Sequence, residues 1–367
     1  MYIDLIALKN YRNYEDVRIE PCRGVTVLTG DNAQGKTNAL ESVYLCCTGR
    51  SHRTSHDREL IRTGSEVAYV KVSGVRRDGR HDVEISLSES GRRQVKVNAS
   101  PVRRSGELLG HITGVLFAPE DLRMVKDGPS VRRRFMDMEL SQLRPSYYYA
   151  LQRYNRALKQ RNALLKEALT APVDPESFDV WERELSLSGA EIVQSRVSFV
   201  GKLADSASDI HASITAGKET LRVTYEPSVP PGESLSETKD NLAKQLLNAR
   251  EKDIKRGLAS FGVHRDDLGI FIGDMDARSY GSQGQVRTCA LSLKLSEIEL
   301  IQKETGEAPV LMLDDVMSEL DPDRRRQLVK RLDGVQALIT CTDKNDLAGA
   351  EIGKLFHVKN AILTEEV

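Results

Sequence analysis

Apolar and polar residues alternate along much of the N-terminal third of the chain, which is the pattern of strands that bury one face. The alternation stops at turn-forming Asp-Gly and Ser-Gly pairs between residues 68 and 97, so an antiparallel meander is expected there. One helix is predicted over residues 38–47, and the polar residues 9–14 are predicted to form a loop. The predicted strands cover residues 2–8, 17–20, 25–29, 68–75, 82–87, 94–97 and 114–117.

Helical spacing dominates the middle of the chain. Long stretches with few helix breakers predict helices over residues 130–143, 146–169, 179–216 and 236–256, with one strand at 221–225. No heptad pattern lasts long enough for an extended coiled coil, so these helices predict an inserted helical arm.

Strands and helices alternate again after residue 261. The pattern predicts strands over residues 268–272, 309–313 and 335–341 and helices over 284–305 and 323–332. We expect the late strands to join the strand at 25–29 in one sheet, with the helical arm inserted between the two halves of that sheet.

The most informative motif directly follows the strand at 25–29. It matches G-x-x-x-x-G-K-[ST], the phosphate-binding loop, between a strand and a helix as this motif requires. Glycines let successive backbone N–H groups point at a phosphate, and the helix N-terminus adds the positive end of its dipole. Lysine is expected to reach the β- and γ-phosphates and threonine to ligate Mg²⁺. The eight residues are Gly30, Asp31, Asn32, Ala33, Gln34, Gly35, Lys36 and Thr37.

Two carboxylates, Asp314 and Asp315, follow the apolar strand at 309–313. In a nucleotide site the first acid holds Mg²⁺ through water, and the next polarises the attacking water. Many strands end in Asp, so the pair indicates a nucleotide site only in combination with the phosphate loop upstream. We expect Asp314 to bind Mg²⁺. Asp315 and Lys36 are expected to be the catalytic residues.

A Ser- and Gly-rich segment, residues 279–285, leads into the helix at 284–305. It offers a hydroxyl, approachable backbone N–H groups and a helix dipole, which together form a second phosphate-binding surface. One protomer cannot usually wrap both surfaces round one nucleotide. The sequence therefore predicts a site shared between two protomers.

Composition excludes several classes of protein. The 367 residues are 40% hydrophobic and 29% charged, which is ordinary for soluble proteins, and no apolar run approaches the ~18 residues of a membrane span. The N-terminus has no signal-peptide pattern, and five cysteines without C-x-x-C suggest neither disulfides nor zinc. We expect a cytoplasmic protein with no membrane partner. His52 and His56 are expected in a polar surface loop.

The net charge of −1 hides an uneven distribution. Residues 50–134 hold 18 Lys and Arg but 11 Asp and Glu, a basic lobe that fits either nucleic acid or a solvated charged face. Arg132, Arg133 and Arg134 open a helix, where positive charge opposes the dipole. This cost suggests contact with DNA phosphate, and the alternative is pairing with acids of the arm.

The order of these motifs resembles ABC-type ATPase heads, which dimerise with two ATP molecules between them. A narrower resemblance, to the bacterial RecF family, covers essentially the whole chain. It is carried by residues 8–14, 30–37, 117–122, 132–137, 262–267, 281–285 and 313–321, the last of which includes a D-loop-like segment.

The resemblance implies an α/β fold, an SMC/Rad50-like ABC-type ATPase head with a mixed phosphate-loop sheet, an antiparallel meander and an inserted helical arm. The expected domains are 1–137 and 259–367 for the two parts of the head and 138–258 for the arm. The implied function is an ATP-dependent homodimer that clamps single-stranded, double-stranded and gapped DNA in repair and replication, with slow DNA-dependent ATP hydrolysis. The implied partners are RecR, RecO, RecA and single-strand-binding protein.

The resemblance also implies roles for single residues. Arg12 and Asn13 should touch phosphates, and Glu120 should contact Mg²⁺ or its water. Nucleotide binding is further implied for Ser282, Gly284 and Gln285. Of these, Ser282 and Gly284 should face the partner's γ-phosphate.

Two departures from transporter ATPases argue against fast turnover. Asp315 stands where those proteins carry the longer glutamate, and Thr342 falls near their switch histidine. ATP is therefore expected to act as a timer. The segment 264–267, His-Arg-Asp-Asp, is expected to be a salt-bridged turn rather than a catalytic group. A transporter ATPase subunit and an ATP-binding scaffold without hydrolysis are the alternative functions.

Overall fold

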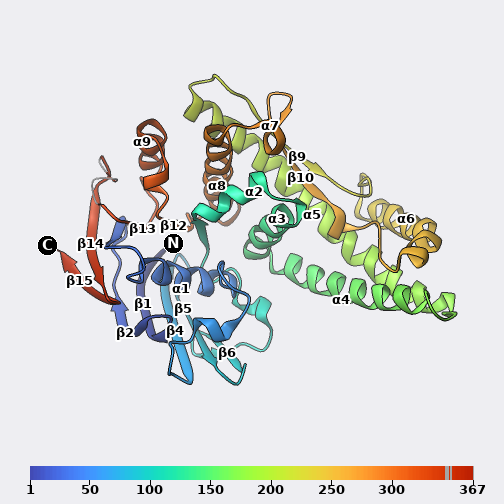
Figure 1. Ribbon diagram of the computed structural model, residues 1–367, viewed down its shortest axis with the longest axis horizontal. Coiled ribbons are helices and arrows are strands. Elements are labelled where there is room, and N and C mark those ends of the chain that lie inside the picture. Colours follow the sequence, from blue (N-terminus) through green and yellow to red (C-terminus); the bar gives the residue numbers. More distant parts are fainter. Residues whose placement is uncertain (344–346, 348, 367) are drawn as a thin grey trace. The chain divides into compact units, whose positions relative to one another are not determined.

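The structure is a computed structural model that describes residues 1–343, 347 and 349–366 (Figure 1). The chain divides into two compact units. Unit 1 contains Met1–Leu122, Ile210–Lys218 and the chain from Arg287 onward, and unit 2 contains Arg123–Asp209 and Glu219–Val286. The boundaries of these packing units differ from those of the domains expected from the sequence. The expected domain boundaries at 137/138 and 258/259 stay a prediction.

A mixed sheet in unit 1 carries the phosphate loop. Its strand order is β15-β14-β3-β13-β12-β8, in which only β15 runs antiparallel to its neighbour. The expected union of the strand at 25–29 with the late strands is confirmed for 309–313 and 335–341. It is wrong for 268–272, because that strand pairs with residues 221–226 in a separate sheet. The bounds are β3 Val25–Thr29, β8 Gly114–Phe117, β12 Val310–Asp314, β13 Ala337–Cys341, β14 Ile352–Lys359 and β15 Ile362–Glu366.

The last two of these strands, β14 and β15, were not expected from the sequence. In β14 only Phe356 and Val358 are fully buried, and β15 is exposed along most of its length. Neither strand therefore shows the long alternation of buried and exposed positions by which half-buried strands are recognised.

The second sheet of unit 1 is antiparallel throughout, in the order β2-β1-β4-β5-β6-β7. The expected meander is confirmed. The expected loop at 9–14 is wrong, because β1 continues to Tyr11 and β2 begins at Tyr14, which leaves Arg12 and Asn13 as the turn. Both tyrosines are fully buried. The bounds are β1 Tyr2–Tyr11, β2 Tyr14–Ile19, β4 Val67–Arg76, β5 Gly79–Ser88, β6 Arg93–Val97 and β7 Ser100–Pro101.

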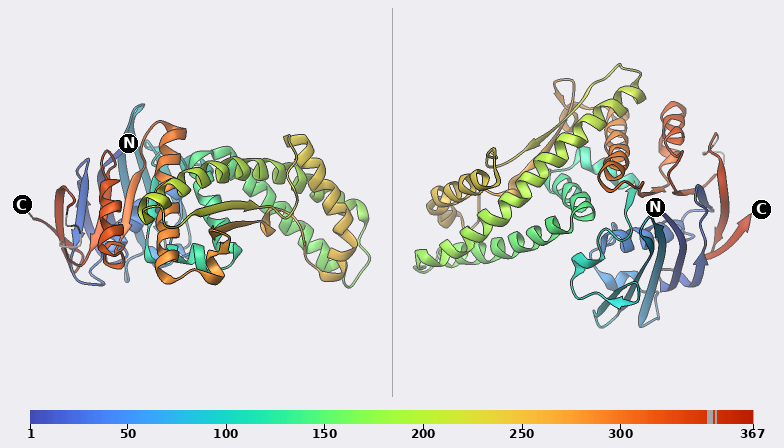
Figure 2. Two further views of the ribbon diagram at one scale, coloured as in Figure 1. Left: turned by 90° about the horizontal axis from the view of Figure 1, so that it is seen from above. Right: turned by 180° about the vertical axis from the view of Figure 1, so that it is seen from behind.

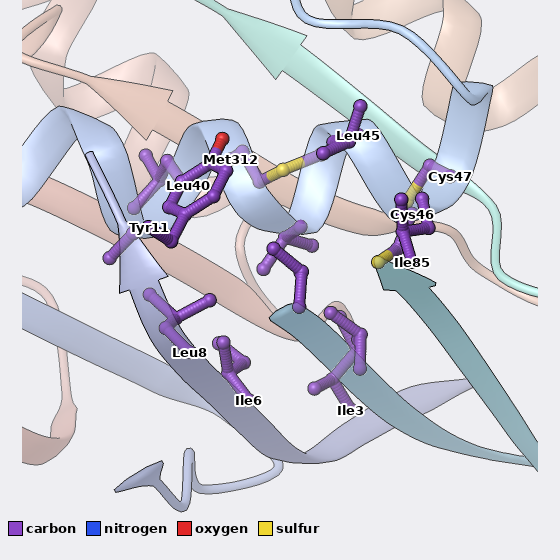
Figure 3. Close-up of a cluster of buried hydrophobic side chains, with 14 of the residues drawn as sticks. Ile3, Ile6, Leu8, Tyr11, Leu40, Leu45, Cys46, Cys47, Ile85 and Met312 are labelled. Carbon is purple, nitrogen blue, oxygen red and sulfur yellow. The ribbon is translucent and has the colours of Figure 1, made fainter. Parts of the chain in front are cut away.

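Helix α1 (Lys36–Thr48) packs against both sheets, touching β4 and β5 of one and β8, β12 and β13 of the other. Figure 3 shows Leu40 and Cys46 of α1 next to apolar side chains of the antiparallel sheet, such as Leu8. Met312 of β12 reaches the same cluster. Because α1 is buried on almost every side, its N-terminus is fixed where the phosphate loop ends.

The remaining elements of unit 1 are short, apart from two helices. Helix α8 (Gln283–Thr305) begins in unit 2 and continues in unit 1, and α9 (Pro322–Lys330) follows the acidic strand. None of the helices that the structure describes is long and apolar enough to cross a membrane. The short 3₁₀ helices are η1 Asp57–Leu60, η2 Ser105–Leu108, η3 Pro119–Leu122 and η5 Met317–Glu319.

Unit 2 consists of long helices and a small sheet of order β11-β10-β9. The expected long helices are confirmed to within four residues at each end. Figure 2 shows α4 beside α5, and side-chain ion pairs join the two helices. The bounds are α2 Arg123–Lys126, α3 Pro129–Leu143, α4 Pro145–Glu167, α5 Pro175–Thr215, α6 Leu235–Arg256, α7 Ala277–Tyr280, η4 Val263–Arg265, β9 Leu221–Glu226, β10 Asp267–Ile272 and β11 Met275–Asp276.

A buried arginine on α5, Arg196, links four parts of unit 2. Its side chain is 1% exposed, and its guanidinium donates to Asp137 at 2.8 Å, Asp266 at 2.9 Å and the Val263 carbonyl at 2.8 Å. It also donates to the Tyr147 hydroxyl at 3.1 Å. A buried cation is tolerated only when its donors are satisfied in this way.

The segment 264–267 is a salt-bridged turn, as expected. Asp266 accepts from Arg196, and Asp267 pairs with Arg132 at 2.7 Å. His264 Nδ1 and the Tyr154 hydroxyl are hydrogen-bonded at 2.9 Å. Burial lowers the pKa of the His264 imidazole to about 4.

We predict that Arg196→Met lowers the free energy of unfolding by about 3–5 kcal/mol, because it leaves two acids without their buried partner. Urea denaturation followed by circular dichroism measures the loss. The matched control is Arg153→Met, whose guanidinium pairs with Glu184 and Glu191 but is 46% exposed, so its removal costs less than about 1 kcal/mol. Equal losses in the two variants would contradict the assigned role.

Candidate nucleotide-binding site

The phosphate loop lies between β3 and α1 and has three residues with left-handed backbone. Gly30 and Gly35 have φ of 140° and 119°, and Ala33 has φ of 65°. A Cβ on Gly30 would lie 2.3 Å from the Val358 carbonyl oxygen, and a Cβ on Gly35 would lie 2.8 Å from the Asn13 amide. Both glycines are therefore required by backbone shape and by space. The result is a curled loop that ends at a helix N-terminus, which suits an anion.

Two hairpin turns hold the loop from outside. The turn of β14 and β15 donates from the Asn360 N–H to the Gln34 side chain at 2.6 Å and from the Ala361 N–H to the Gln34 carbonyl at 3.1 Å. The turn of β1 and β2 donates from the Asn13 amide to the same carbonyl at 3.0 Å. The loop is thus fixed by residues more than 300 positions apart in the sequence.

Lys36 lies with its ammonium inside the curl. Nζ donates to the carbonyl oxygens of Gly30 at 2.5 Å and Asp31 at 2.9 Å, and the residue is 7% exposed. Burial lowers the pKa of the ammonium, and the charges of Asp315 and Asp314 oppose that shift. A cation held inside a loop of backbone N–H groups is suited to the β- and γ-phosphates of a nucleotide.

Three oxygens meet at the carboxyl ends of the central strands. Asp314 Oδ1 accepts from the Thr37 hydroxyl at 2.9 Å and from the Thr340 hydroxyl at 2.7 Å. The parallel register of β12 and β13 pairs Asp314 with Thr340. Hard oxygen donors of this kind, one carboxylate with hydroxyls beside a phosphate loop, fit Mg²⁺. The residues present therefore fit the expected group.

Asp315 has a strained backbone, with φ of 52°, a conformation that is uncommon outside glycine. Its N–H donates to the Thr340 hydroxyl oxygen at 2.9 Å, and its carbonyl accepts from the Ser318 hydroxyl at 2.9 Å. Strain that neighbours hold in place is frequent at functional sites. The side chain is partly exposed, so it can meet a water molecule.

Thr340 is the site residue that the sequence analysis missed. Its hydroxyl serves both acids, donating to Asp314 and accepting from the Asp315 N–H. Only the strand register reveals this role, because no motif contains residue 340. Thr342, which the sequence analysis considered instead, is exposed just beyond β13.

Arg12 lies beside the loop, but the structure places its guanidinium on an acid. It donates to both oxygens of Glu41 at 2.8 and 2.9 Å and to the Glu59 carbonyl at 2.8 Å. Burial raises the pKa of Glu41, but hydrogen bonds from Arg12 and Ser51 outweigh it and leave that pKa below the usual value. Arg12 therefore supports α1, and its contact with phosphate stays a prediction.

Asn13 likewise acts on the loop from outside. Besides the Gln34 carbonyl, its amide contacts Asn38, whose Nδ2 donates to the Asn13 oxygen at 2.8 Å. Asn38 also accepts from Arg53 at 2.8 Å. These bonds extend the polar rim of the loop across the first turn of α1. A direct contact between Asn13 and phosphate stays a prediction.

His52 lies in the polar loop between α1 and η1, as expected, but its side chain is partly buried. Both ring nitrogens are buried, and no described residue hydrogen-bonds to them. The ring lies edge-on to Tyr44, with centroids 5.5 Å apart, and burial lowers the pKa of the imidazole. His56 is exposed, as expected. Glu120 lies exposed in η3, and its contact with Mg²⁺ or its water stays a prediction.

In unit 2, Ser282 and Gln285 form a capping box at the start of α8. The Ser282 N–H donates to the Gln285 side chain at 2.9 Å, and the Gln285 N–H donates to the Ser282 hydroxyl at 3.3 Å. Gln285 also donates to Glu219 at 2.9 Å. Ser282 is exposed and Gly284 is partly exposed. Their role at a partner's γ-phosphate stays a prediction.

The arginine run at the start of α3 has mixed surroundings. Arg132 is 5% exposed and holds Asp267 through two hydrogen bonds of 2.7 Å, and Arg133 donates to the Asp266 carbonyl at 2.6 Å. These contacts favour the alternative of pairing with acids over contact with DNA. Arg134 is exposed. Contact of Arg132 and Arg133 with DNA stays a prediction.

Comparison with known proteins gives a consistent family. The family model for the RecF/RecN/SMC N terminal domain matches residues 2–364. A DNA replication and repair protein RecF from Acetivibrio thermocellus is 42% identical over 361 residues, which are 98% of each chain. The protein of that name from Alkaliphilus oremlandii is 44% identical over 344 residues, which are 93% of each chain.

Solved structures agree with the sequence relatives. A structure of the recombination mediator protein RecF with ATP, described as belonging to the RecFOR pathway, has a TM-score of 0.93 at 36% identity and covers 100% of this chain and 98% of its own. An Smc head domain from Pyrococcus yayanosii has a TM-score of 0.59 at 14% identity and covers 100% and 96%, a likeness of fold alone. The expected ABC-type ATPase head is confirmed.

We predict that Thr340→Val weakens Mg²⁺ binding in the presence of nucleotide by about 10- to 100-fold, because it removes the hydroxyl that orients Asp314. Nucleotide binding without Mg²⁺ should be unchanged, since the loop is intact. Titration of Mg²⁺ against a fluorescent ATP analogue measures both quantities.

The matched control is Thr26→Val, another buried strand threonine, whose hydroxyl oxygen accepts from the Cys22 N–H at 3.0 Å, away from the carboxyl ends of the strands. If both valine variants bind Mg²⁺ equally well, Thr340 does not support the site.

Proposed function

We propose that this chain, which belongs to the RecF family, is an ATP-dependent DNA-binding protein of recombinational repair and replication. The observation that carries the proposal is the meeting of Thr37, Asp314 and Thr340 at the base of a complete phosphate loop. Support also comes from a similar chain that is solved with ATP and from relatives named for DNA replication and repair. We place this activity in the cytoplasm.

In this proposal the chain holds ATP through parts that are already in place. The loop N–H groups and the Lys36 ammonium neutralise the phosphates, and Thr37 with Asp314 holds the metal. Mg²⁺, when bound, stabilises negative charge on the phosphate oxygens. Because these groups are fixed before the nucleotide arrives, binding needs little reorganisation.

Slow hydrolysis follows from the position of Asp315. The carboxylate is one methylene shorter than glutamate, and its backbone is fixed by Thr340 and Ser318 in a left-handed conformation. It can orient a water molecule as general base, but it has little freedom to approach. We therefore propose a switch, with ATP binding as the closing signal and slow, DNA-dependent hydrolysis as release.

The switch works through a homodimer in which each protomer completes the other's site. Ser282 lies exposed at the N-terminus of α8, where a hydroxyl, backbone N–H groups and the helix dipole can meet a γ-phosphate. Closure of two such protomers would clamp single-stranded, double-stranded or gapped DNA. RecR, RecO, RecA and single-strand-binding protein are proposed partners through family membership.

The alternatives receive less support. A transporter ATPase subunit is disfavoured because the similar proteins are named for DNA replication and repair. A scaffold without hydrolysis differs from the proposal only in the activity of Asp315. Measurement of phosphate release by the unmodified protein and by Asp315→Asn separates these two functions.

We predict that Lys36→Ala abolishes ATP-driven dimerisation, because Lys36 is the cation that the loop places on the phosphates. Light scattering with and without ATP measures the dimer. The control is Lys9→Ala, an exposed lysine of β1, which should dimerise normally. An undiminished dimer in Lys36→Ala would refute the role of ATP in pairing.

We predict that Ser282→Arg preserves ATP binding by the monomer but blocks pairing, because its bulk and charge fall at the shared phosphate site. Ser282→Asn is the control, since asparagine keeps the helix cap without a large side chain. Normal ATP-driven dimerisation of Ser282→Arg, measured by light scattering, would show that residues 281–285 do not face a partner.

A further inference from the structure

The outward face of α4 carries positive charge that the fold does not use. The helix turns Tyr154, Ala157 and Leu165 into unit 2, where they are buried. At 3.6 residues per turn, Arg156 and Lys159 project from the opposite side, and both are exposed. Lys166, about two turns beyond Lys159, is also exposed.

The remaining cations of α4 hold the arm together. Arg161 is fully buried and pairs with Glu182 at 3.0 Å and with Asp253 at 2.8 Å. Arg153 pairs with Glu184 and Glu191 of α5. These pairs join α4 to α5 and α6.

The cations of the outward face have no such partners. Among the residues that the structure describes, no carboxylate pairs with Arg156, Lys159 or Lys166. Glu167 is the only acid in the sequence of α4, so the helix lacks the Glu-to-Lys pairs that stabilise an ordinary surface helix. Arg156 and Lys159 also lie three residues apart, where like charges repel. A polyanion on this face would remove that repulsion.

An aromatic side chain extends the row at its N-terminal end. Tyr149, Arg156, Lys159 and Lys166 are separated by steps of seven, three and seven residues, so they form one row about 26 Å long that winds by about 100° around the helix from end to end. Tyr149 is partly exposed, and its ring lies edge-on to Tyr148 with centroids 5.7 Å apart. Cations in line with an exposed ring are the combination that binds single-stranded nucleic acid.

We propose that this α4 row is a binding surface for single-stranded DNA. The three cations contact successive phosphates, and Tyr149 stacks on a base. The inference rests on the proposed function as a DNA-binding protein. It adds the location on the chain at which single-stranded DNA binds. Duplex DNA would satisfy the cations, but its paired bases would leave Tyr149 without a partner. The strand is therefore preferred over the duplex at this face.

Helix α6 offers a matched control in the same unit. Lys244 and Lys252 are exposed there, but α6 mixes acids and bases along its length, with Asp240 four residues before Lys244. The test pair is Arg156→Glu with Lys159→Glu, and the control pair is Lys244→Glu with Lys252→Glu. The two double variants carry the same change in net charge.

The experiment measures binding of the full-length protein to fluorescent single-stranded and duplex oligonucleotides by anisotropy at several salt concentrations. The test pair should lose about tenfold or more in affinity for the single strand, and the slope of log affinity against log salt should fall by about 1.4, which corresponds to two phosphate contacts. Tyr149→Ala should weaken single-strand binding several-fold at an unchanged salt slope, with little effect on duplex binding.

The inference is overturned if the test pair behaves like the control pair, or if Tyr149→Ala weakens duplex and single strand equally. The inference is also overturned if the test pair loses binding to an acidic protein while its binding to DNA is unchanged. ATP-driven dimerisation of the same variants, by light scattering, should be normal. An unmodified protein that binds no DNA would refute the proposed function and this inference together, whereas failure of the test pair alone refutes only the α4 row.

Discussion

One carboxylate oxygen, Oδ1 of Asp314, accepts hydrogen bonds from Thr37 at 2.9 Å and from Thr340 at 2.7 Å. This small contact joins the phosphate loop, the acidic strand β12 and the strand β13 that separates them. It exists only because β3, β13 and β12 are parallel and in register, which brings their carboxyl ends to one edge of the sheet. Everything that we infer about nucleotide chemistry depends on this alignment.

Three arginines of the fold pair with acids and so have structural roles. Arg12, Arg132 and Arg196 each hold acids from other elements, on α1, β10 and α3 respectively. A cation paired in this way holds elements of the fold together around a binding surface. The exposed cations Arg156, Lys159 and Lys166 of α4 are the contrast, because no carboxylate within the described chain pairs with them. Burial and pairing therefore separate structural from binding arginines better than sequence runs do.

Sequence patterns predicted the phosphate loop, the acidic strand and the long helices because each has a local signal. A glycine loop between a strand and a helix, an apolar run that ends in carboxylates, and helical spacing can all be seen within about twenty residues. Thr340 and the β14–β15 turn could not be predicted, because their roles depend on contacts between distant strands. The burial of both His52 ring nitrogens could not be predicted for a related reason, since a polar neighbourhood in sequence gave no sign of it.

The central claim is that two protomers share each ATP site, and the most direct test is the dependence of hydrolysis on protein concentration. If each protomer completes its partner's site, the rate of phosphate release per protomer should rise with concentration and level off once the ATP-bound dimer has formed. A rate per protomer that is constant from well below to well above the concentration for dimer formation would show that a single chain hydrolyses ATP alone, and would contradict the account.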